Sequence, residues 1–307
     1  MRFATYRSPR DGAEHVGVVL DEALHGLPDT RLIDLLGPDQ LADAAQRAER
    51  DPVEVLAVAE ADLRAPIPVP PSIRDFMAFE EHVVTASAGL GHQVHPDWYE
   101  LPVFYFTNPA AVLGPFDDVA ISPGSTAFDY ELEIAAVVGT PGSDLGPDDA
   151  EDHIAGFMLF CDWSARDLQA REMALRLGPA KGKDSATSLG PYLVTPDELG
   201  DRGTGSAPSL AMTASVNGET WSSGDLADLH WSFGQLLAYA SRGTTLRAGD
   251  ILGSGTVGTG CILELSTTHG PQARPYLVPG DRVRLAAGRL GAIEARIRPA
   301  VAVRELR

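Results

Sequence analysis

The chain has 307 residues, of which 44% are hydrophobic and 22% charged, as in an ordinary globular protein. Its net charge of −19 argues against a nucleic-acid partner, because binding phosphates requires clustered lysine and arginine. We find no apolar run of about 18 residues that could span a membrane and no apolar signal-peptide core, so we expect a cytoplasmic protein without nucleic-acid or membrane partners.

The sequence of the first part of the chain predicts a small separate domain. Two short runs, RFATY and HVGVVL, alternate like strands, and residues 39–63 have the apolar spacing of an amphipathic helix. The proline-rich segment 65–71 should be stiff and extended, because each proline fixes φ and removes a backbone donor. We therefore predict a small N-terminal α/β domain over residues 1–66 and a main domain over residues 67–307.

The main domain is predicted to be mostly β. Ser72 could cap a helix through residues 75–87, and segment 229–243 predicts another helix that ends at Gly243. The Asn-Gly pair at 217–218 is typical of a tight hairpin turn. Because helices and strands do not alternate regularly, we expect an α+β fold. The predicted strands are residues 103–107, 130–139, 155–163, 191–195, 210–216, 250–255, 261–266, 282–287 and 291–297.

The chain has two cysteines, Cys161 and Cys261, too few for a disulfide framework and without CxxC spacing. Both lie in apolar stretches of the sequence. We expect buried, reduced thiols.

The run from Gly253 to Gly258 matches the GxGxxG pattern of dinucleotide-binding loops. That pattern requires a strand before it and a helix after it, whereas the residues that follow, 259–265, are β-type. Without a helix amino terminus to hold a pyrophosphate, we expect no nucleotide here. We predict instead a tight turn that lies beside a metal site and brings the backbone close to a small ligand.

Acidic residues lie at the ends of two predicted core strands. Glu131 and Glu133 leave the same face of one strand, with Cα atoms about 7 Å apart. They are either the solvated face of an edge strand or a pair that a cation must neutralise. Asp162 ends another apolar strand and could be a metal ligand or a cap of the next helix. On that helix, Arg166 and Gln169 could orient Asp162 or grip a substrate carboxylate.

A fourth acid and a histidine precede these residues. Ser72-x-x-Asp75 has the form of a capping box, so Asp75 could serve only the start of a helix. His82 would then lie two turns further along that helix, about 10 Å away. Three or four carboxylates suit a hard divalent cation, Mg²⁺ above all, with Mn²⁺ or Ca²⁺ as alternatives. His92 and His95 could suggest zinc, but they lie in a polar loop without cysteine partners.

In their order along the chain, these motifs resemble the fumarylacetoacetate hydrolase family. The resemblance covers roughly residues 70–300 and implies a mixed β-roll catalytic domain behind a small N-terminal domain, commonly as a homodimer. The runs that carry it are Asp75-Phe-x5-His82, Phe128-Asp-Tyr-Glu131-Leu-Glu133, Asp162-Trp-Ser-Ala-Arg166-Asp-x-Gln169, Lys181-Gly-Lys183 and Ser254-Gly-Thr256.

The resemblance also implies roles for single residues. The family's base is a histidine polarised by a glutamate, and it matches His82 with Glu264, which we place in a strand after the glycine turn. The other implied residues are Asp75, Glu131, Glu133 and Asp162 as metal ligands, Lys183 as the basic residue near the metal, and Thr256 and Tyr105 as substrate contacts.

These features predict hydrolytic carbon–carbon cleavage of a small oxo acid of the β-diketo or acylpyruvate type, with a divalent cation chelating its enol and keto oxygens. The alternatives are decarboxylation of a β-keto acid such as oxaloacetate or a tautomerisation on the same metal, and a binding protein without turnover. Met77 and Met173 stand where fumarylacetoacetate hydrolase itself has tyrosines, which argues against fumarylacetoacetate as the substrate. His82 within reach of Glu264 beside the metal would favour hydrolysis.

Overall fold

The computed structural model of the chain describes residues 1–28, 30–89, 91–200 and 205–304. Most of its strands belong to one thirteen-stranded sheet. These strands are β1 (Arg2–Arg7), β2 (Glu14–Leu20), β3 (Ala23–Leu27), β4 (Val55–Ala57), β5 (Asp62–Leu63), β6 (Ile73–Phe76), β7 (Phe104–Thr107), β8 (Val112–Leu113), β11 (Leu132–Val138), β13 (Ile154–Asp162), β15 (Thr187–Leu189), β16 (Leu193–Val194) and β20 (Ile251–Gly253). The main path runs β4-β3-β2-β1-β16-β13-β11-β20-β6-β7, with β5 beside β1, β15 beside β13 and β8 beside β15.

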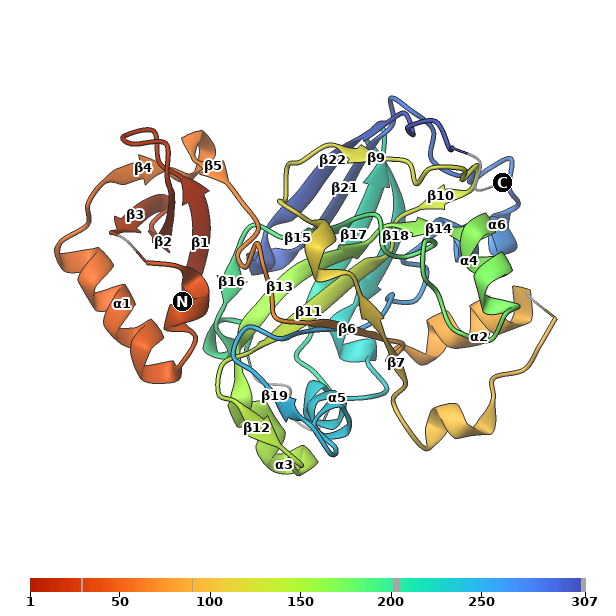
Figure 1. The fold of residues 1–307 in the computed structure, drawn as a ribbon, viewed down its shortest axis with the longest axis horizontal. Helices are drawn as coiled ribbons and strands as arrows, with labels where there is room; N and C mark the ends of the chain where they lie inside the picture. Colours follow the sequence, from red (N-terminus) through yellow and green to blue (C-terminus); the bar gives the residue numbers. More distant parts are fainter. Residues whose placement is uncertain (29, 90, 201–204, 305–307) are drawn as a thin grey trace.

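The amino-terminal part forms a lobe of its own, at the left of Figure 1, from β1 to β5 and α1 (Pro38–Arg50). Two register pairs join β1 to β16, Arg2 with Val194 and Phe3 with Leu193, so the sheet is continuous between the lobe and the main body. The predicted boundary between residues 66 and 67 stays a prediction. The helix predicted to reach residue 63 ends at Arg50, because β4 and β5 occupy the later residues.

A second, five-stranded sheet packs against β11 and β13. Its strands, in the order β18-β17-β21-β22-β9, are β18 (Glu219–Asp225), β17 (Ala211–Val216), β21 (Arg282–Ala287), β22 (Ala292–Arg298) and β9 (Val119–Ala120). Asn217 and Gly218 connect β17 to β18 with φ angles of 52° and 85°, which confirms the predicted hairpin turn. Buried side chains such as Ile134 and Leu285 belong to one core between the sheets.

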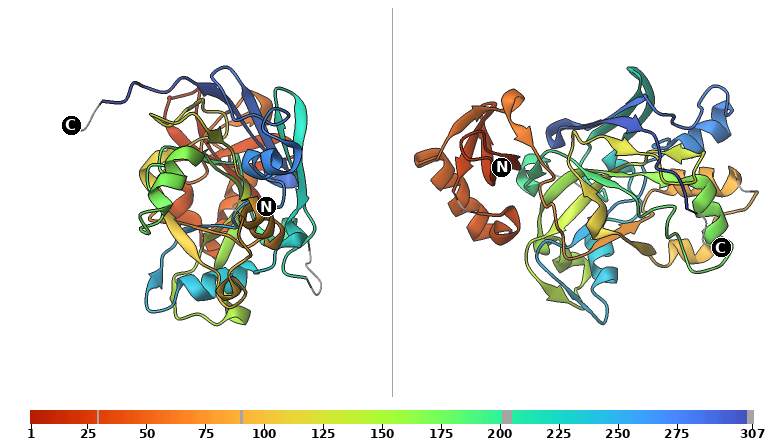
Figure 2. Two further views of the ribbon diagram at one scale, coloured as in Figure 1. Left: turned by 90° about the vertical axis from the view of Figure 1, so that its right-hand side faces the viewer. Right: turned by 45° about the horizontal axis from the view of Figure 1, so that its top comes forward.

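Three helices gather at the right-hand end of Figure 1 and of the right panel of Figure 2: α2 (Glu80–Gly89), α4 (Arg166–Met173) and α6 (Ile262–His269). Helices α3 (Pro147–Ala150) and α5 (Phe233–Ala240) pack together on another side. Among the described residues, no helix is long and apolar enough to cross a membrane. The remaining elements are β10 (Phe128–Asp129), β12 (Gly142–Ser143), β14 (Ser164–Ala165), β19 (Thr245–Leu246) and 3-10 helices at Leu32–Leu35, Val58–Glu60, Pro96–Tyr99, Pro109–Ala111, Glu151–His153, Pro196–Glu198, Leu226–Asp228 and Gly288–Leu290.

The helix predicted to begin after Ser72 is wrong over its first part. Asp75 lies in β6, which pairs with both β20 and β7, and the helix begins only at Glu80. The Ser72 hydroxyl caps nothing and donates to Asp250 at 2.7 Å. A local capping pattern is therefore overridden by pairing on both sides of a short buried strand.

Candidate active site

Four acidic side chains converge where the central strands meet. Asp75 lies in β6, Glu133 in β11 and Asp162 at the end of β13, and Glu131 directly precedes β11. All four are buried, with Glu131 the most exposed at 5%. Carboxylate oxygens of Asp75, Glu131 and Glu133 lie within 4.8 Å of one another. This burial excludes a solvated edge for the glutamates, and Asp162 is no helix cap, since the residue before α4 is Ala165.

Two glycines make room for this convergence. Gly253 lies in β20, between the strands that carry Asp75 and Glu133. A Cβ atom at position 253 would lie 2.6 Å from Asp75 Oδ1 and 3.2 Å from Glu133 Oε2. The amide of Gly255, a residue with φ of +77°, donates to Glu133 Oε2 at 3.0 Å. The glycine turn therefore lies beside the carboxylates, as its sequence predicts.

Lys183 and Tyr105 connect the carboxylates to one another. The Lys183 ammonium donates to Asp162 Oδ2 at 2.7 Å and also to Glu131. The Tyr105 hydroxyl contacts Asp75 Oδ2 at 2.8 Å and also Asp162. Because a phenol has one proton, Tyr105 can donate to only one of these two acids at a time. The second contact requires either a protonated carboxyl or a cation that draws the oxygens together.

Arg166 is buried against two acids rather than open to a substrate. Its Nη1 atom lies 2.8 Å from Glu131 Oε1 and 3.1 Å from Gln169 Oε1, and its Nε atom lies 2.8 Å from Asp129 Oδ2. Asp129 was not among the site residues predicted from the sequence. A sequence signal was present, because acids recur at every second position of the run Asp129-Tyr-Glu131-Leu-Glu133, although Asp129 lies in β10 and Glu133 in β11.

The charges of this cluster do not balance within the protein. Among the described residues of this cluster, five buried acids, including Asp129, face two buried cations, Lys183 and Arg166. Burial raises the pKa of Asp75, of Glu133 and of Asp162. For Glu131, burial acts in the same direction, but Lys183 and Arg166 hold its pKa well below the usual range.

The carboxylate cluster fits a hard divalent cation. Asp75 Oδ1 and Asp162 Oδ1 are buried and lack a hydrogen-bond partner among the described residues. Carboxylate oxygens are the donors that Mg²⁺, Mn²⁺ and Ca²⁺ prefer, at about 2.0–2.6 Å from Mg²⁺ or Ca²⁺. A cation here would satisfy both free oxygens and offset the excess negative charge.

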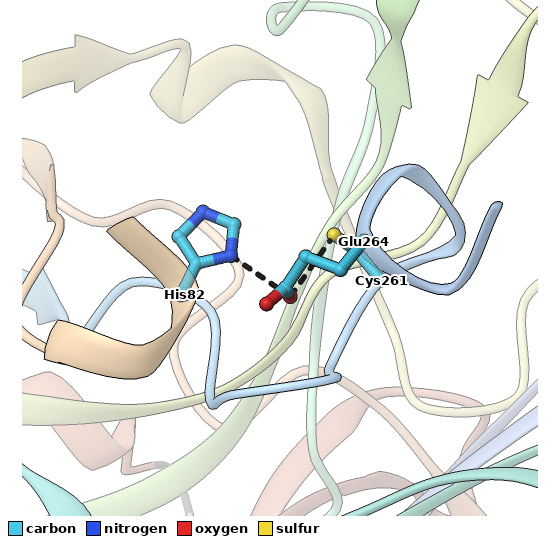
Figure 3. Close-up of side chains that lie close together, drawn as sticks. All are labelled: His82, Cys261 and Glu264. Carbon is cyan, nitrogen blue, oxygen red and sulfur yellow. Dashed lines mark hydrogen bonds and ion pairs between the residues drawn. The ribbon is translucent and has the colours of Figure 1, made fainter. Parts of the chain in front are cut away.

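His82 and Glu264 meet although 182 positions separate them in the sequence. Nδ1 of His82, on α2, lies 2.9 Å from Oε2 of Glu264, on α6 (Figure 3). Glu264 is held in turn by the amide of Thr259 at 3.2 Å and the thiol of Cys261 at 3.4 Å. The pair lies close to the carboxylate cluster, because Cys261 forms a β-bridge with Glu131.

The strand predicted around Glu264 is wrong, since residues 262–269 form α6. A helix therefore does follow the glycine run, where β-type residues were predicted. Its amino terminus is already engaged by an acid, because Asp129 accepts the amides of Ile262 at 2.7 Å and Leu263 at 3.0 Å. An internal carboxylate takes the place that a phosphate would need.

The remaining predicted substrate contacts lie close to the carboxylates. Thr256 is 2% exposed, and its hydroxyl lies 3.5 Å from Glu133 Oε1, at the limit of a hydrogen bond. Gln169 is half-buried and contacts Arg166. Cavities of about 150, 180 and 250 Å³ lie elsewhere in the molecule, the last lined by Phe157, Leu226 and Phe233 among others. The candidate active site is therefore identified by the chemistry of its side chains and not by the volume of a cavity.

The region that carries these groups matches known proteins. Residues 72–298 match the family model described as fumarylacetoacetate (FAA) hydrolase C-terminal. The fumarylacetoacetase of Oryza sativa subsp. japonica is 33% identical over 248 residues, which cover 63% of this chain and 57% of that protein. A mitochondrial oxaloacetate tautomerase of Homo sapiens is 28% identical, over 95% of this chain and 90% of that protein. The chain thus spans less than two thirds of the plant relative.

Solved structures agree on the fold. The fumarylacetoacetate hydrolase of Exiguobacterium antarcticum superposes with a TM-score of 0.73 at 25% identity, covering 97% of this chain and 99% of that one. Maleylpyruvate hydrolase from Sphingobium, at 22% identity and a TM-score of 0.72, shares the fold. The fold and the matched region define the class, a mostly β catalytic domain of the fumarylacetoacetate hydrolase type. The chain belongs to the fumarylacetoacetate hydrolase family.

Proposed function

We propose that this chain is a divalent-cation-dependent hydrolase that cleaves a carbon–carbon bond of a β-diketo or acylpyruvate-type acid. The observation that carries the proposal is the 2.9 Å contact between His82 and Glu264 beside a buried carboxylate cluster. Hydrolysis needs a base that removes a proton from water, and the His82–Glu264 pair is the best candidate for this base. Relatives named as fumarylacetoacetases support a hydrolytic member of the family.

Asp75, Glu131, Glu133 and Asp162 would hold the cation. When bound, a divalent cation supplies Lewis acidity toward the keto and enol oxygens of the substrate. Despite its burial, Lys183 has a pKa held above its ordinary value by Asp162 and Glu131, so it stays protonated. Its charge would stabilise the anion that forms when the carbon–carbon bond breaks.

His82 would act on water. With a proton on Nδ1 directed at Glu264, the imidazole presents Nε2 as the acceptor, and Glu264 fixes that tautomer. Nε2 removes a proton from water, and the resulting hydroxide adds to the acyl carbonyl carbon. The carbon–carbon bond then breaks, and its electron pair passes into the enolate of the departing oxo acid. The proton returned by His82 completes that product, and the second product is a carboxylic acid.

A tautomerase is the second candidate, because the relatives that align over nearly the whole chain are named oxaloacetate tautomerases. Tautomerisation moves a proton between carbon and oxygen without consuming water. His82 could serve either reaction, so the two differ in product rather than in the base.

The test is a product assay with purified protein and Mg²⁺ or Mn²⁺. Acylpyruvates, other diketo acids and oxaloacetate are supplied in turn, and released pyruvate, released carboxylic acid and enol absorbance are followed. We expect pyruvate and a carboxylic acid in equal amounts from an acylpyruvate. Turnover of oxaloacetate tautomers alone, without cleavage of any diketo acid, would replace the hydrolase by the tautomerase.

A further inference from the structure

Cys261 is the third member of the His82–Glu264 contact, and the proposed reaction does not use it. Its thiol donates to Glu264 Oε2 at 3.4 Å, the same oxygen that lies 2.9 Å from His82 Nδ1 (Figure 3). One donor atom from each of the three residues lies within 4.8 Å of the others. All three side chains are buried, and Cys261 forms no disulfide.

The elements bring these residues together without strain at the cysteine. Cys261 precedes α6 in extended backbone, and Glu264 lies three residues later in the first turn of that helix. His82 reaches them from α2, which packs against α6. A tetrahedral Zn²⁺ ion with bonds of about 2.0–2.3 Å holds its ligand atoms roughly 3.3–3.8 Å apart. Small shifts of the three side chains would produce that spacing.

The histidine nitrogen supplies a second observation. His82 Nδ1 is buried and has no well-aligned hydrogen bond, although it lies at ion-pair distance from Glu264. Figure 3 shows this nitrogen directed at the Glu264 carboxylate, on the side where Cys261 lies. An imidazole, a carboxylate and a thiol favour a thiophilic ion, whereas the all-oxygen cluster favours a hard one. The two neighbouring sites should therefore select different metals.

We propose that His82, Cys261 and Glu264 form a second metal site, for a thiophilic divalent cation such as Zn²⁺, which disables the His82–Glu264 pair when filled. Binding releases the Cys261 proton to solvent as the thiolate takes its place on the metal. A metal on Nδ1 forces the remaining imidazole proton onto Nε2, so His82 can no longer accept a proton from water. The binding stands independently of the proposed function, whereas the inhibition rests on it.

The chain's two cysteines allow a direct spectroscopic test. Protein saturated with Mg²⁺, which we expect to fill the carboxylate cluster, is titrated with Co²⁺ while thiolate-to-metal charge-transfer absorbance is recorded. We expect the band in the unaltered chain and in Cys161→Ser, its loss in Cys261→Ala and Cys261→Ser, and its displacement by Zn²⁺. Circular dichroism and Tm check that each variant is folded. Absence of the band from the unaltered chain, or its persistence in folded Cys261→Ser, overturns the site.

An activity assay tests the inhibition separately. Zn²⁺ is added to Mg²⁺-saturated protein turning over a diketo acid, and each variant is compared with its own rate before Zn²⁺. Half-inhibition of Cys261→Ser should require at least about ten-fold more Zn²⁺ than that of Cys161→Ser, because one ligand is lost. A Cys261-dependent band without inhibition overturns the inhibitory half of the proposal. If the band is absent while His82→Ala still abolishes hydrolysis, the second site fails and the proposed function stands.

Discussion

Arg166 and Asp129 form a buried ion pair, with Nε 2.8 Å from Oδ2, that ties the two halves of the candidate site together. On one side Arg166 reaches Glu131 of the carboxylate cluster at 2.8 Å. On the other, Asp129 accepts the first amides of α6, the helix that carries Glu264. This salt bridge and the β-bridge between Cys261 and Glu131 together set the position of the His82–Glu264 pair relative to the cluster.

The first prediction concerns this link. Asp129→Asn removes one of the two buried carboxylates that face Arg166 and leaves Glu131 as its remaining charged partner, so we expect a loss of about 3–5 kcal/mol in the free energy of unfolding, the usual cost of breaking a buried ion pair. Denaturant melts measure it. The matched control is Asp34→Asn, which removes the exposed partner of Arg31 and should change stability little. Equal effects of the two substitutions would contradict the structural role of Asp129.

The second prediction concerns the base. His82→Ala should keep metal affinity but reduce hydrolysis by about 10²–10⁴, the usual value of a positioned acid–base group. Glu264→Gln should lose much of the same factor, and the double variant should lose little more, because the two residues act as a unit. Steady-state kinetics measure all three, with the exposed His95→Ala as control. Hydrolysis that survives His82→Ala within a few-fold would remove this pair from the mechanism, whereas decarboxylation should be little affected.

The third prediction concerns the metal. A chelator should abolish activity, and added Mg²⁺ or Mn²⁺ should restore it. Glu133→Gln and Asp75→Asn should each weaken Mn²⁺ binding by more than the ~10–100-fold that loss of an outer partner costs, because each removes a charged ligand. Calorimetric titration provides the affinities. Glu294→Gln, at a surface pair with Arg284, serves as the control. Unchanged Mn²⁺ affinity in Glu133→Gln would exclude Glu133 from the metal site.

The fourth prediction follows from proton linkage. Burial raises the pKa of Asp75, of Glu133 and of Asp162, so without metal these three groups bind more protons in the native state than in the unfolded chain. Stability of the metal-free protein should therefore fall as pH rises above the ordinary carboxyl values of 3.8 and 4.5. A cation replaces those protons, so the increase in Tm that Mg²⁺ or Mn²⁺ gives should grow with pH. Melts with and without chelator at several pH values measure this, and a pH-independent increase would count against it.

The fifth prediction concerns the glycine that separates two ligands. Gly253→Ala places a methyl group 2.6 Å from Asp75 Oδ1, so the carboxylate must move and Mn²⁺ affinity should fall. Gly146→Ala is the control, because its added Cβ meets only Asp149 Oδ2 at 3.5 Å. Calorimetric titration of both variants with Mn²⁺ measures the two affinities. Equal Mn²⁺ affinities would show that the site tolerates the added methyl group.

The elements that were predicted correctly are those whose structure is determined by residue patterns within the element itself. Apolar runs bordered by acids predicted the strands around Glu133 and Asp162, and Asn217-Gly218 predicted its hairpin. The segments around Asp75 and Glu264 were mispredicted because their structure depends on distant partners. Asp75 is drawn into a strand by β20 and β7, and α6 begins where Asp129 accepts its amides.

The sequence predicted which residues belong to the site better than it predicted how they contact one another. Pattern and family resemblance together indicated the carboxylates, and the resemblance alone paired His82 with Glu264. Neither indicated that Arg166 is committed to Asp129 and Glu131, or that Tyr105 joins Asp75 to Asp162. Those contacts arise from side-chain directions across several strands, which spacing along one segment does not encode.

The pairing of β1 with β16 has a consequence for truncated forms. Residues 193 and 194 are flanked by β13 on one side and by β1 on the other. In a fragment cut at the family boundary, residues 72–298, that second side becomes an open edge of unpaired amides and carbonyls. Removal of Phe3 and Leu36 would also uncover apolar neighbours such as Leu193. We therefore expect the amino-terminal lobe to protect this edge from pairing with another copy of the chain, and a fragment made without the lobe to self-associate.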